Sequence, residues 1–214
     1  MRYKFVILLN GMFLLASSAA LAQTVAPTTV ASTAPTATVQ IDCSSNLQKN
    51  ALLNANLNEK RGQFLYGSQL VSGQCMADGK KDIKLGMSYI VKSAAQNYPP
   101  AMYTVGVTYL TQGIDQPALA MLFGAAKKGV REAEIMLGMM FANEKFSKKN
   151  NLSAYGWLSL AQKHAATAKQ EKILADKLAE VRTRMTPEEL TKADETKAKF
   201  LKEMGDIPVF TDLP

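Results

Sequence analysis

The chain has 214 residues, of which 47% are hydrophobic and 20% are charged, and its formal net charge is +7. This length and composition are typical of a soluble globular protein with one substantial core. Basic and acidic residues are mixed along the predicted helices, and aromatic residues are not interleaved with Lys and Arg, which argues against nucleic-acid binding.

The first 22 residues have the pattern of a secretory signal peptide. Arg2 and Lys4 precede an uncharged run over residues 5–15, and a stretch of small residues ends at Ala22. Cleavage after Ala22 leaves 192 residues and lowers the formal charge from +7 to +5. The uncharged run is too short for a comfortable membrane span, and no apolar run of about 20 residues follows it. We therefore expect a Sec-exported protein without a membrane span, located in the periplasm or released from the cell.

Three segments follow the predicted signal peptide. Residues 23–42 are rich in Thr, Ala and Pro and carry no helical period, so we expect a flexible linker that acts as a spacer. Residues 43–204 form the predicted helical domain, whose first helix Asp42 or Ser44 can cap. Residues 205–214 form a C-terminal tail. We expect this tail to be loosely held, and the alternative is a strip docked along the domain.

The two cysteines, Cys43 and Cys75, both lie in the predicted exported part. An even number of cysteines in an oxidising compartment favours a disulfide, worth about 3 to 4 kcal/mol for a loop of this size in the chain-entropy description. A metal or redox pair lacks support because the chain has one histidine and no C-x-x-C spacing. We expect a disulfide that fastens the first helices together.

The middle of the chain repeats itself, and the repeat decides the predicted fold. A first set of residues, Ala101, Val105, Gly106 and Tyr109, recurs 32 positions later as Ala133, Leu137, Gly138 and Phe141. A second set, Ala118, Met121 and Ala125, recurs 36 positions later as Ala154, Trp157 and Ala161. An earlier copy places Gly67 against Gly106, and Ala94-Ala95 against Ala125-Ala126.

Each repeat is predicted to be a helix hairpin. Apolar residues recur at three- and four-residue spacing, and Gly or Pro residues separate the runs. The small residues allow the two helix backbones of a hairpin to approach, while Tyr109, Phe141 and Trp157 fill the gaps between hairpins. One hairpin cannot cover its own apolar face, so neighbouring hairpins must stack around a continuous core.

The repeat pattern resembles that of a known family, the Sel1-like repeats, which are relatives of the tetratricopeptide repeats. The string AAKKGVREAEIMLGMMF, residues 125–141, is similar to the family's junction between two repeats, and LSAYGWLSLAQKHA with the later MTPEEL is similar to its C-terminal part. Met121 departs from the Trp that the family often has, and Tyr98 stands in place of the turn glycine. The resemblance implies an all-α, right-handed α-solenoid of about three stacked hairpins, closed by C-terminal capping helices.

The resemblance also implies a binding surface, because first helices of the hairpins line the concave face in this family. Counting from the small glycines gives a mostly apolar groove, suited to a peptide or an amphipathic helix. The groove residues are Phe64, Val71, Tyr103, Val107, Leu110, Ile135 and Met139. An N-terminal helix or the C-terminal tail covering several of them is the alternative.

The sequence gives little support for catalysis. The one histidine, His164, follows a helix of packing residues and is expected to be a helix-end side chain. Glu132 and Glu134 lie two apart on a helix and do not form a carboxylate pair. The methionines near the repeat junction are expected in the core rather than at a metal site. We therefore expect no enzyme activity, no cofactor and no bound metal.

These observations favour a monomeric adaptor that binds a protein partner in the cell envelope, in the assembly or regulation of a complex such as a secretion system. Two alternatives remain. Cysteine-rich exported members of the family are linked to cell-wall fragments and β-lactams, but they carry a cysteine pair in successive repeats, whereas this chain has only two cysteines. The second alternative is release from the cell as a factor that acts on a host.

Overall fold

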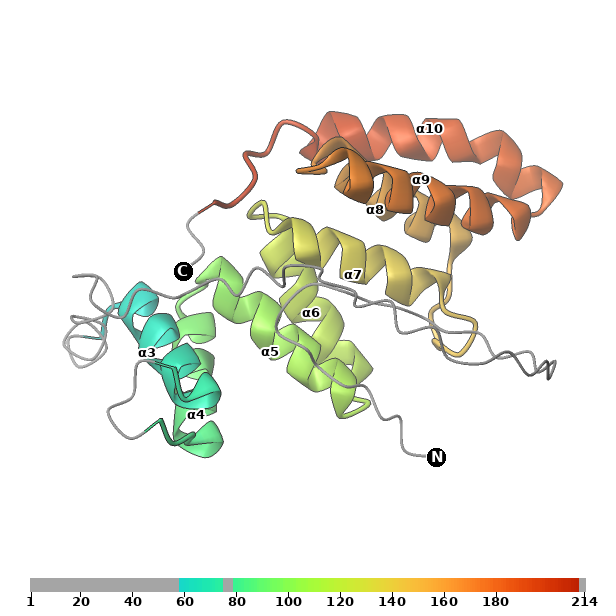
Figure 1. The fold of residues 1–214 in the computed structure, drawn as a ribbon. Coiled ribbons are helices and arrows are strands. Elements are labelled where there is room, and N and C mark those ends of the chain that lie inside the picture. Colours follow the sequence, from blue (N-terminus) through green and yellow to red (C-terminus); the bar gives the residue numbers. More distant parts are fainter. Residues whose placement is uncertain (1–57, 75–78, 212–214) are drawn as a thin grey trace, which may run out of the picture. The chain divides into compact units, whose positions relative to one another are not determined.

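The structure is a computed structural model that describes residues 58–74 and 79–211 (Figure 1). The predicted signal peptide, the linker, both cysteines and residues 212–214 lie outside the described residues, and so does the predicted Cys43–Cys75 disulfide. Within the described ranges the regular structure is entirely helical, which confirms the predicted all-α class. None of the helices found there has both the length and the apolar character that crossing a membrane requires.

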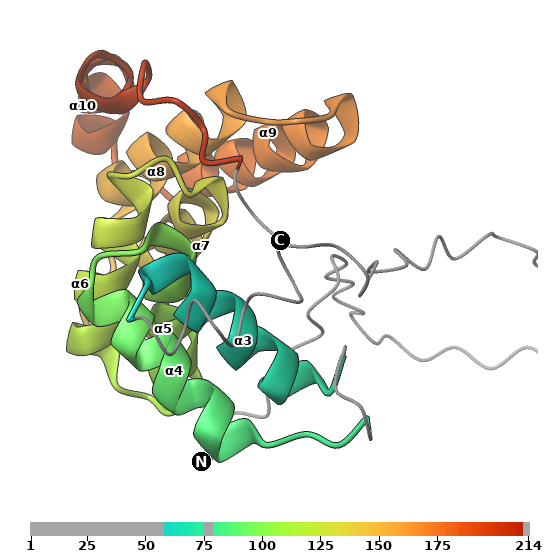
Figure 2. The same ribbon diagram turned by 90° about the vertical axis from the view of Figure 1, so that its left-hand side faces the viewer.

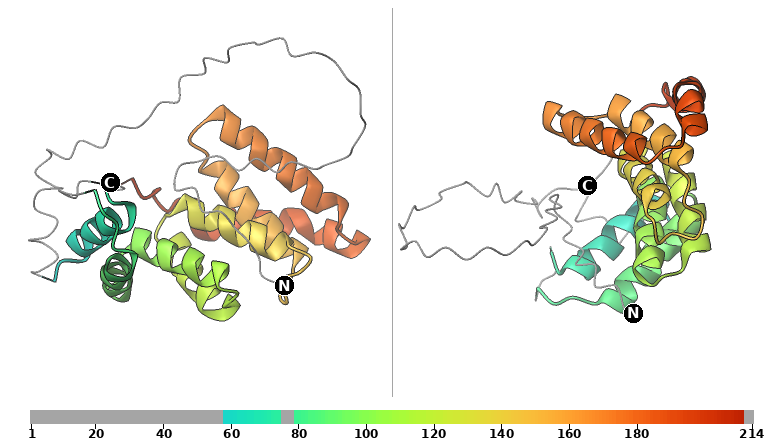
Figure 3. Two further views of the ribbon diagram at one scale, coloured as in Figure 1. Left: turned by 60° about the horizontal axis from the view of Figure 1, so that its bottom comes forward. Right: turned by 90° about the vertical axis from the view of Figure 1, so that its right-hand side faces the viewer.

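The described helices form a stack of hairpins (Figure 1). They are α3 Lys60–Ser72, α4 Ile83–Ala95, α5 Pro99–Thr111, α6 Asp115–Ala126, α7 Arg131–Ala142, α8 Asn151–Lys163, α9 Ala168–Thr183 and α10 Pro187–Met204. The pairs α3/α4, α5/α6 and α7/α8 are the three predicted hairpins, and successive hairpins meet through α4 with α5 and α6 with α7 (Figure 2). Both α9 and α10 pack against α8 and close the stack (Figure 3).

Side-chain caps fix where several of these helices begin. The carboxylate of Glu59 accepts hydrogen bonds from the first turn of α3, and Asp82 and Asn150 do the same for α4 and α8. Thr186 accepts from the backbone N–H of Glu189, whose carboxylate accepts in return from the backbone N–H of Thr186. This capping box fixes the start of α10.

The turns between hairpins show that one predicted equivalence was wrong by a residue. Gly129 has a φ of 83° between α6 and α7, and Asn97 has a φ of 59° between α4 and α5. Asn97, rather than Tyr98, therefore takes the place of the turn glycine, because Asn tolerates the left-handed conformation better than most side chains. Ser93 and Ala94, both buried, stand where the next repeat has Ala125 and Ala126, and Ala95 is exposed.

A glycine in the first helix of each hairpin faces a branched side chain from the second. A Cβ on Gly106 would lie 2.9 Å from Cγ of Leu122, and a Cβ on Gly138 would lie 2.6 Å from Cγ of Leu158. Leu122 and Leu158 have no exposed surface. In the first hairpin a Cβ on Gly67 would lie 2.8 Å from Cγ1 of Ile90. We call these three contacts the glycine joints.

The remaining repeat residues surround the glycine joints. Trp157 is 3% exposed and packs between Phe123 and Phe200, with ring centroids 5.4 and 5.2 Å away. Tyr109 and Phe141 are partly buried against the same core. The alanines at the repeat positions have no exposed surface: Ala101, Ala118, Ala125, Ala154 and Ala161. Small residues thus line the helix contacts, while aromatic rings fill the wider spaces.

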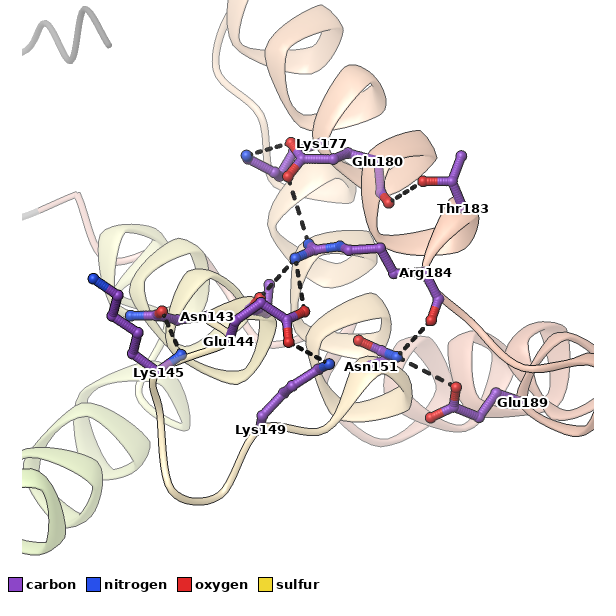
Figure 4. A network of polar contacts seen from close by, with 11 residues as sticks. Asn143, Glu144, Lys145, Lys149, Asn151, Lys177, Glu180, Thr183, Arg184 and Glu189 are labelled. Carbon is purple, nitrogen blue, oxygen red and sulfur yellow. Dashed lines mark hydrogen bonds and ion pairs between the residues drawn. The ribbon is translucent and has the colours of Figure 1, made fainter. Parts of the chain in front are cut away.

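A polar network around Arg184 connects the closing helices to the hairpin α7/α8 (Figure 4). The guanidinium of Arg184 donates to the carbonyl of Ala142 at 3.0 Å and lies 3.4 Å from a carboxylate oxygen of Glu144. The backbone carbonyl of Arg184 accepts from Nδ2 of buried Asn151 at 3.1 Å. The same amide of Asn151 donates to Glu189 at 3.3 Å, so the cap is bonded to the array through both α9 and α10.

The chain after α10 is docked on the array, so the expectation of a loosely held tail was wrong for residues 205–211. The backbone N–H of Phe210 donates to the carbonyl of Gly129 at 2.8 Å. The ring of Phe210 lies edge-on to that of Tyr98, with centroids 5.9 Å apart. Figure 1 shows this segment leaving α10 and returning toward the earlier helices. The docked alternative therefore describes the structure.

The glycine joints predict opposite outcomes for two alanine substitutions. Gly138→Ala places a methyl group against the branch point of Leu158. Overpacking outweighs the gain in helix propensity, and we expect a loss of about 1–2 kcal/mol in the free energy of unfolding. In Gly124→Ala, the matched control, the new Cβ meets only the flexible end of Met102. This control is expected to stay within about 1 kcal/mol of the parent.

Urea unfolding followed by circular dichroism measures both variants. Equal stability of the two would show that position 138 is not sterically constrained.

Candidate functional site

The candidate site is formed by first helices of the second and third hairpins. Tyr103, Val107 and Leu110 follow one another at helical spacing on α5, and Ile135 and Met139 do so on α7. Met139 is 38% exposed, and the other four side chains are half-buried. Each lies at an equivalent distance from the glycine of its own helix, so both helices present them on the same side. We call these five residues the α5–α7 face.

The two groove residues predicted on α3 do not join this face. Phe64 is only 7% exposed, and its ring packs 5.5 Å from that of Tyr98 in the core. Phe64 therefore lies in the core rather than in the predicted groove, because its ring packs against Tyr98. Val71 is half-buried and packs against its own hairpin partner, since its Cγ2 lies 2.7 Å from where a Cβ of Gly86 would be.

Electrostatics link the two helices of the face. Burial raises the pKa of the Tyr103 phenol above 10.0, and the carboxylate of Glu132 raises it further. Tyr103 belongs to α5 and Glu132 to the first turn of α7, so the negative charge of α7 reaches the phenol of α5. Glu132 is itself paired with Arg131 at 3.1 Å, with side chains 39% and 17% exposed. The rim of the face therefore carries a nearly neutral ion pair.

Other places in the described chain offer less for chemistry. An open hollow at the start of α4 is lined by Asp82, Lys84, Leu85 and Ser88, none of which was predicted to bind a partner. Among residues 58–74 and 79–211, no three His, Cys, Asp or Glu side chains gather as a metal site would need.

The contact between Glu134 and His164 was not predicted from the sequence. His164 is the C-cap of α8, as expected, but its ring is buried and contacts Glu134, with Nδ1 3.0 Å from both carboxylate oxygens. Glu134 is 1% exposed. A signal was available, since Glu134 lies four residues before Gly138 and therefore on the packing side of α7. The corresponding residues before Gly67 and Gly106, Gln63 and Met102, are also buried.

Comparison of the sequence with protein-family models gives no match, and comparison with curated proteins gives none either. Solved structures similar to this chain include the following two. A Sel1 repeat protein from Oxalobacter formigenes is 24% identical, with a TM-score of 0.47, over 65% of this chain and 100% of its own. A protective antigen present in uropathogenic Escherichia coli strains, which displays an SLR fold, is 16% identical, with a TM-score of 0.44, over 73% of this chain.

The match spans 41% of the antigen's own length, so this chain corresponds to less than half of that protein. Both similar structures carry the kind of repeat that the sequence resembles.

The α5–α7 face is tested by the titration of Tyr103. Glu132→Gln removes the second cause of the raised pKa, so the pKa of Tyr103 should fall but stay above its ordinary value, because burial is the larger cause. NMR of the Tyr103 ring carbons measures the change. The raised pKa also means that the neutral Tyr103 phenol contributes to the free energy of unfolding. This contribution is fully present below about pH 10 and is lost as the pH rises through the pKa of Tyr103 in the folded protein.

Glu188→Gln on α10 is the control, because it removes an exposed carboxylate at the other end of the described chain. An identical Tyr103 titration in the Glu132→Gln and Glu188→Gln variants would contradict the described placement of α5 and α7.

Proposed function

We propose that the chain is a non-catalytic protein-interaction scaffold and that the α5–α7 face binds an apolar strip of its partner. The observation that carries this proposal is a set of five apolar side chains, from two successive hairpins, of which Met139 is 38% exposed and the other four are only partly covered by the core. Apolar surface that a fold leaves uncovered on one continuous side is characteristic of a protein-binding surface. Its residues come from rigid helices, so little conformational entropy is lost on binding.

The partner segment is an amphipathic helix or an apolar peptide. Side chains at three- and four-residue spacing on α5 match the spacing of one face of a partner helix. The Arg131–Glu132 pair at the rim leaves little net charge there. Affinity therefore comes from the apolar contacts, while the paired charges select the orientation of the partner.

The proposal includes a location. The pattern of residues 1–22 supports export, and the partner is accordingly a protein of the cell envelope, met during the assembly or regulation of an envelope complex. The protein acts in this proposal as a monomer.

Periplasmic cross-linking followed by mass spectrometry tests the proposal. In the Tyr103→Asp, Leu110→Asp double variant, charges on the α5–α7 face should remove the main cross-linked partner. Met139→Asp is a milder second variant, because Met139 is already 38% exposed and its replacement leaves the core intact. Matched controls are Val91→Asp and Ile173→Asp, which charge apolar side chains that are 48% and 57% exposed elsewhere. The controls should keep the partner.

Circular dichroism of each variant establishes that it is folded. A partner list that is unchanged in the folded Met139→Asp and double variants would exclude this face. Saturable binding of a muropeptide by the purified protein, with no protein partner recovered, would instead favour recognition of cell-wall fragments.

A further inference from the structure

The buried pair Glu134–His164 joins three elements that are far apart in the sequence. Glu134 belongs to α7, and His164 is the C-cap of α8. The other ring nitrogen of His164, Nε2, lies 3.2 Å from the backbone carbonyl oxygen of Gly205, the C-cap of α10. Through this contact the pair is connected to Gly205, where the C-terminal segment begins.

Two simultaneous hydrogen bonds from the His164 ring, one at each nitrogen, need one proton more than the neutral imidazole and the carboxylate together hold. Both ring nitrogens of His164 face acceptors, a carboxylate at Nδ1 and a carbonyl at Nε2. A neutral imidazole carries one N–H and cannot donate to both. Both contacts are hydrogen bonds only when the pair holds one further proton. This is so for an imidazolium beside a carboxylate, and equally for a protonated Glu134 that donates to Nδ1 of a neutral ring.

The surroundings favour retention of that proton. Burial raises the pKa of Glu134, against the opposing effects of His164 and of the Arg131 guanidinium, and nearby Glu132 raises it further. Arg131 donates to the backbone carbonyl of His164 at 3.2 Å rather than to the carboxylate of Glu134. Near Gly205, Lys163 is paired with Asp206 at 3.0 Å, so that end of the site is close to neutral.

The segment that starts at Gly205 makes its farthest contacts at the turn before α7. Phe210 donates its N–H to Gly129 and places its ring against Tyr98, which is 4% exposed in this arrangement. The carbonyl of Pro208 occupies the space where Gly129 would carry a side chain. Residues 205–211 form no helix beyond α10. Their position depends on these contacts, on the Lys163–Asp206 pair, on the hydrogen bond from the backbone N–H of Ile207 to the carbonyl of Met204, and on the contact of His164 with Gly205.

We propose that the Glu134–His164 pair is a proton-dependent latch, which keeps the segment Gly205–Phe210 docked on Gly129 and Tyr98 while the shared proton is present and releases it when the proton is lost. Deprotonation leaves Nδ1–H bonded to the carboxylate and turns the lone pair of Nε2 toward the carbonyl oxygen of Gly205. Two acceptors then face each other at hydrogen-bonding distance, which replaces an attraction by a repulsion.

The direction of the pH effect follows from the proton count. The docked state holds one proton more than the released state, so docking is favoured at low pH and lost as the pH rises through the titration of the pair. Release of the segment Gly205–Phe210 exposes the ring of Tyr98 and the carbonyl of Gly129, at the turn before α7, to solvent. The latch thus controls access to a surface that the chain itself covers.

The test uses the full chain, in which His164 is the one histidine and gives unambiguous imidazole signals. Long-range proton–nitrogen NMR from about pH 5 to about pH 9 reports whether Nε2 carries a proton. Hydrogen exchange reports the protection of the Phe210 amide over the same range. Glu134→Gln is the matched variant, because its amide donates to Nδ1 at every pH and leaves Nε2–H to bond Gly205.

We expect Nε2 of the parent chain to lose its proton as the pH rises. The protection of the Phe210 amide should fall at the same midpoint, by at least about tenfold relative to Glu134→Gln at the same pH. The variant should keep Nε2 protonated and the segment docked throughout. An Nε2 that never titrates, or a Phe210 protection that does not follow it, would overturn the proposal.

If Glu134→Gln fails to fold, the protection of the Phe210 amide in the parent chain is compared instead with the intrinsic exchange rate of an unfolded amide at each pH, and the same fall at the same midpoint is expected.

Discussion

The structure depends on how closely the two helices of each hairpin approach. A glycine in the first helix leaves room for a branched side chain of the second, and at Gly138 and Leu158 even one methyl group would lie 2.6 Å from the facing carbon. The close approach sets the distance between helices, and through it the positions of α5 and α7 whose outer sides form the candidate face. Helix propensity is reduced by about 1 kcal/mol at each glycine, which the packing must offset.

Closure of the stack depends on polar contacts as much as on the core. Arg184 and Asn151 bond α9 and α10 to the third hairpin, and His164 connects the end of α10 with α7. Burial of such groups is costly unless they find partners, and the contacts of the Arg184 Nη1 and the Asn151 Nδ2 atoms meet part of this need. The Nε atom of Arg184 and the Oδ1 atom of Asn151 are buried without a hydrogen-bond partner among the described residues. The docked C-terminal segment follows from the same arrangement, since Gly205 lies at the end of the bonded helix.

The hairpins, the positions of the glycines and the start of α10 at Thr186 were predictable, because periodicity and local capping encode them. Features that depend on distant partners were not. Phe64 packs against Tyr98, whose ring also contacts Phe210, and no local pattern indicates that Phe210 returns to Tyr98. The first repeat was aligned one residue off, because Asn97 replaces glycine in the left-handed turn. The leucines that face Gly106 and Gly138 could not be predicted either, because in the sequence each is one of many apolar residues on its helix.

The most direct test of this account is a double-mutant cycle between positions 138 and 158, measured by urea unfolding. Leu158→Ala in the parent chain leaves a cavity and should cost about 2–5 kcal/mol. When Gly138→Ala is already present, its methyl group occupies part of that space and the cost should be smaller by at least about 1 kcal/mol. Additive effects of the two substitutions would contradict the claim that these residues form the joint on which the hairpin is built.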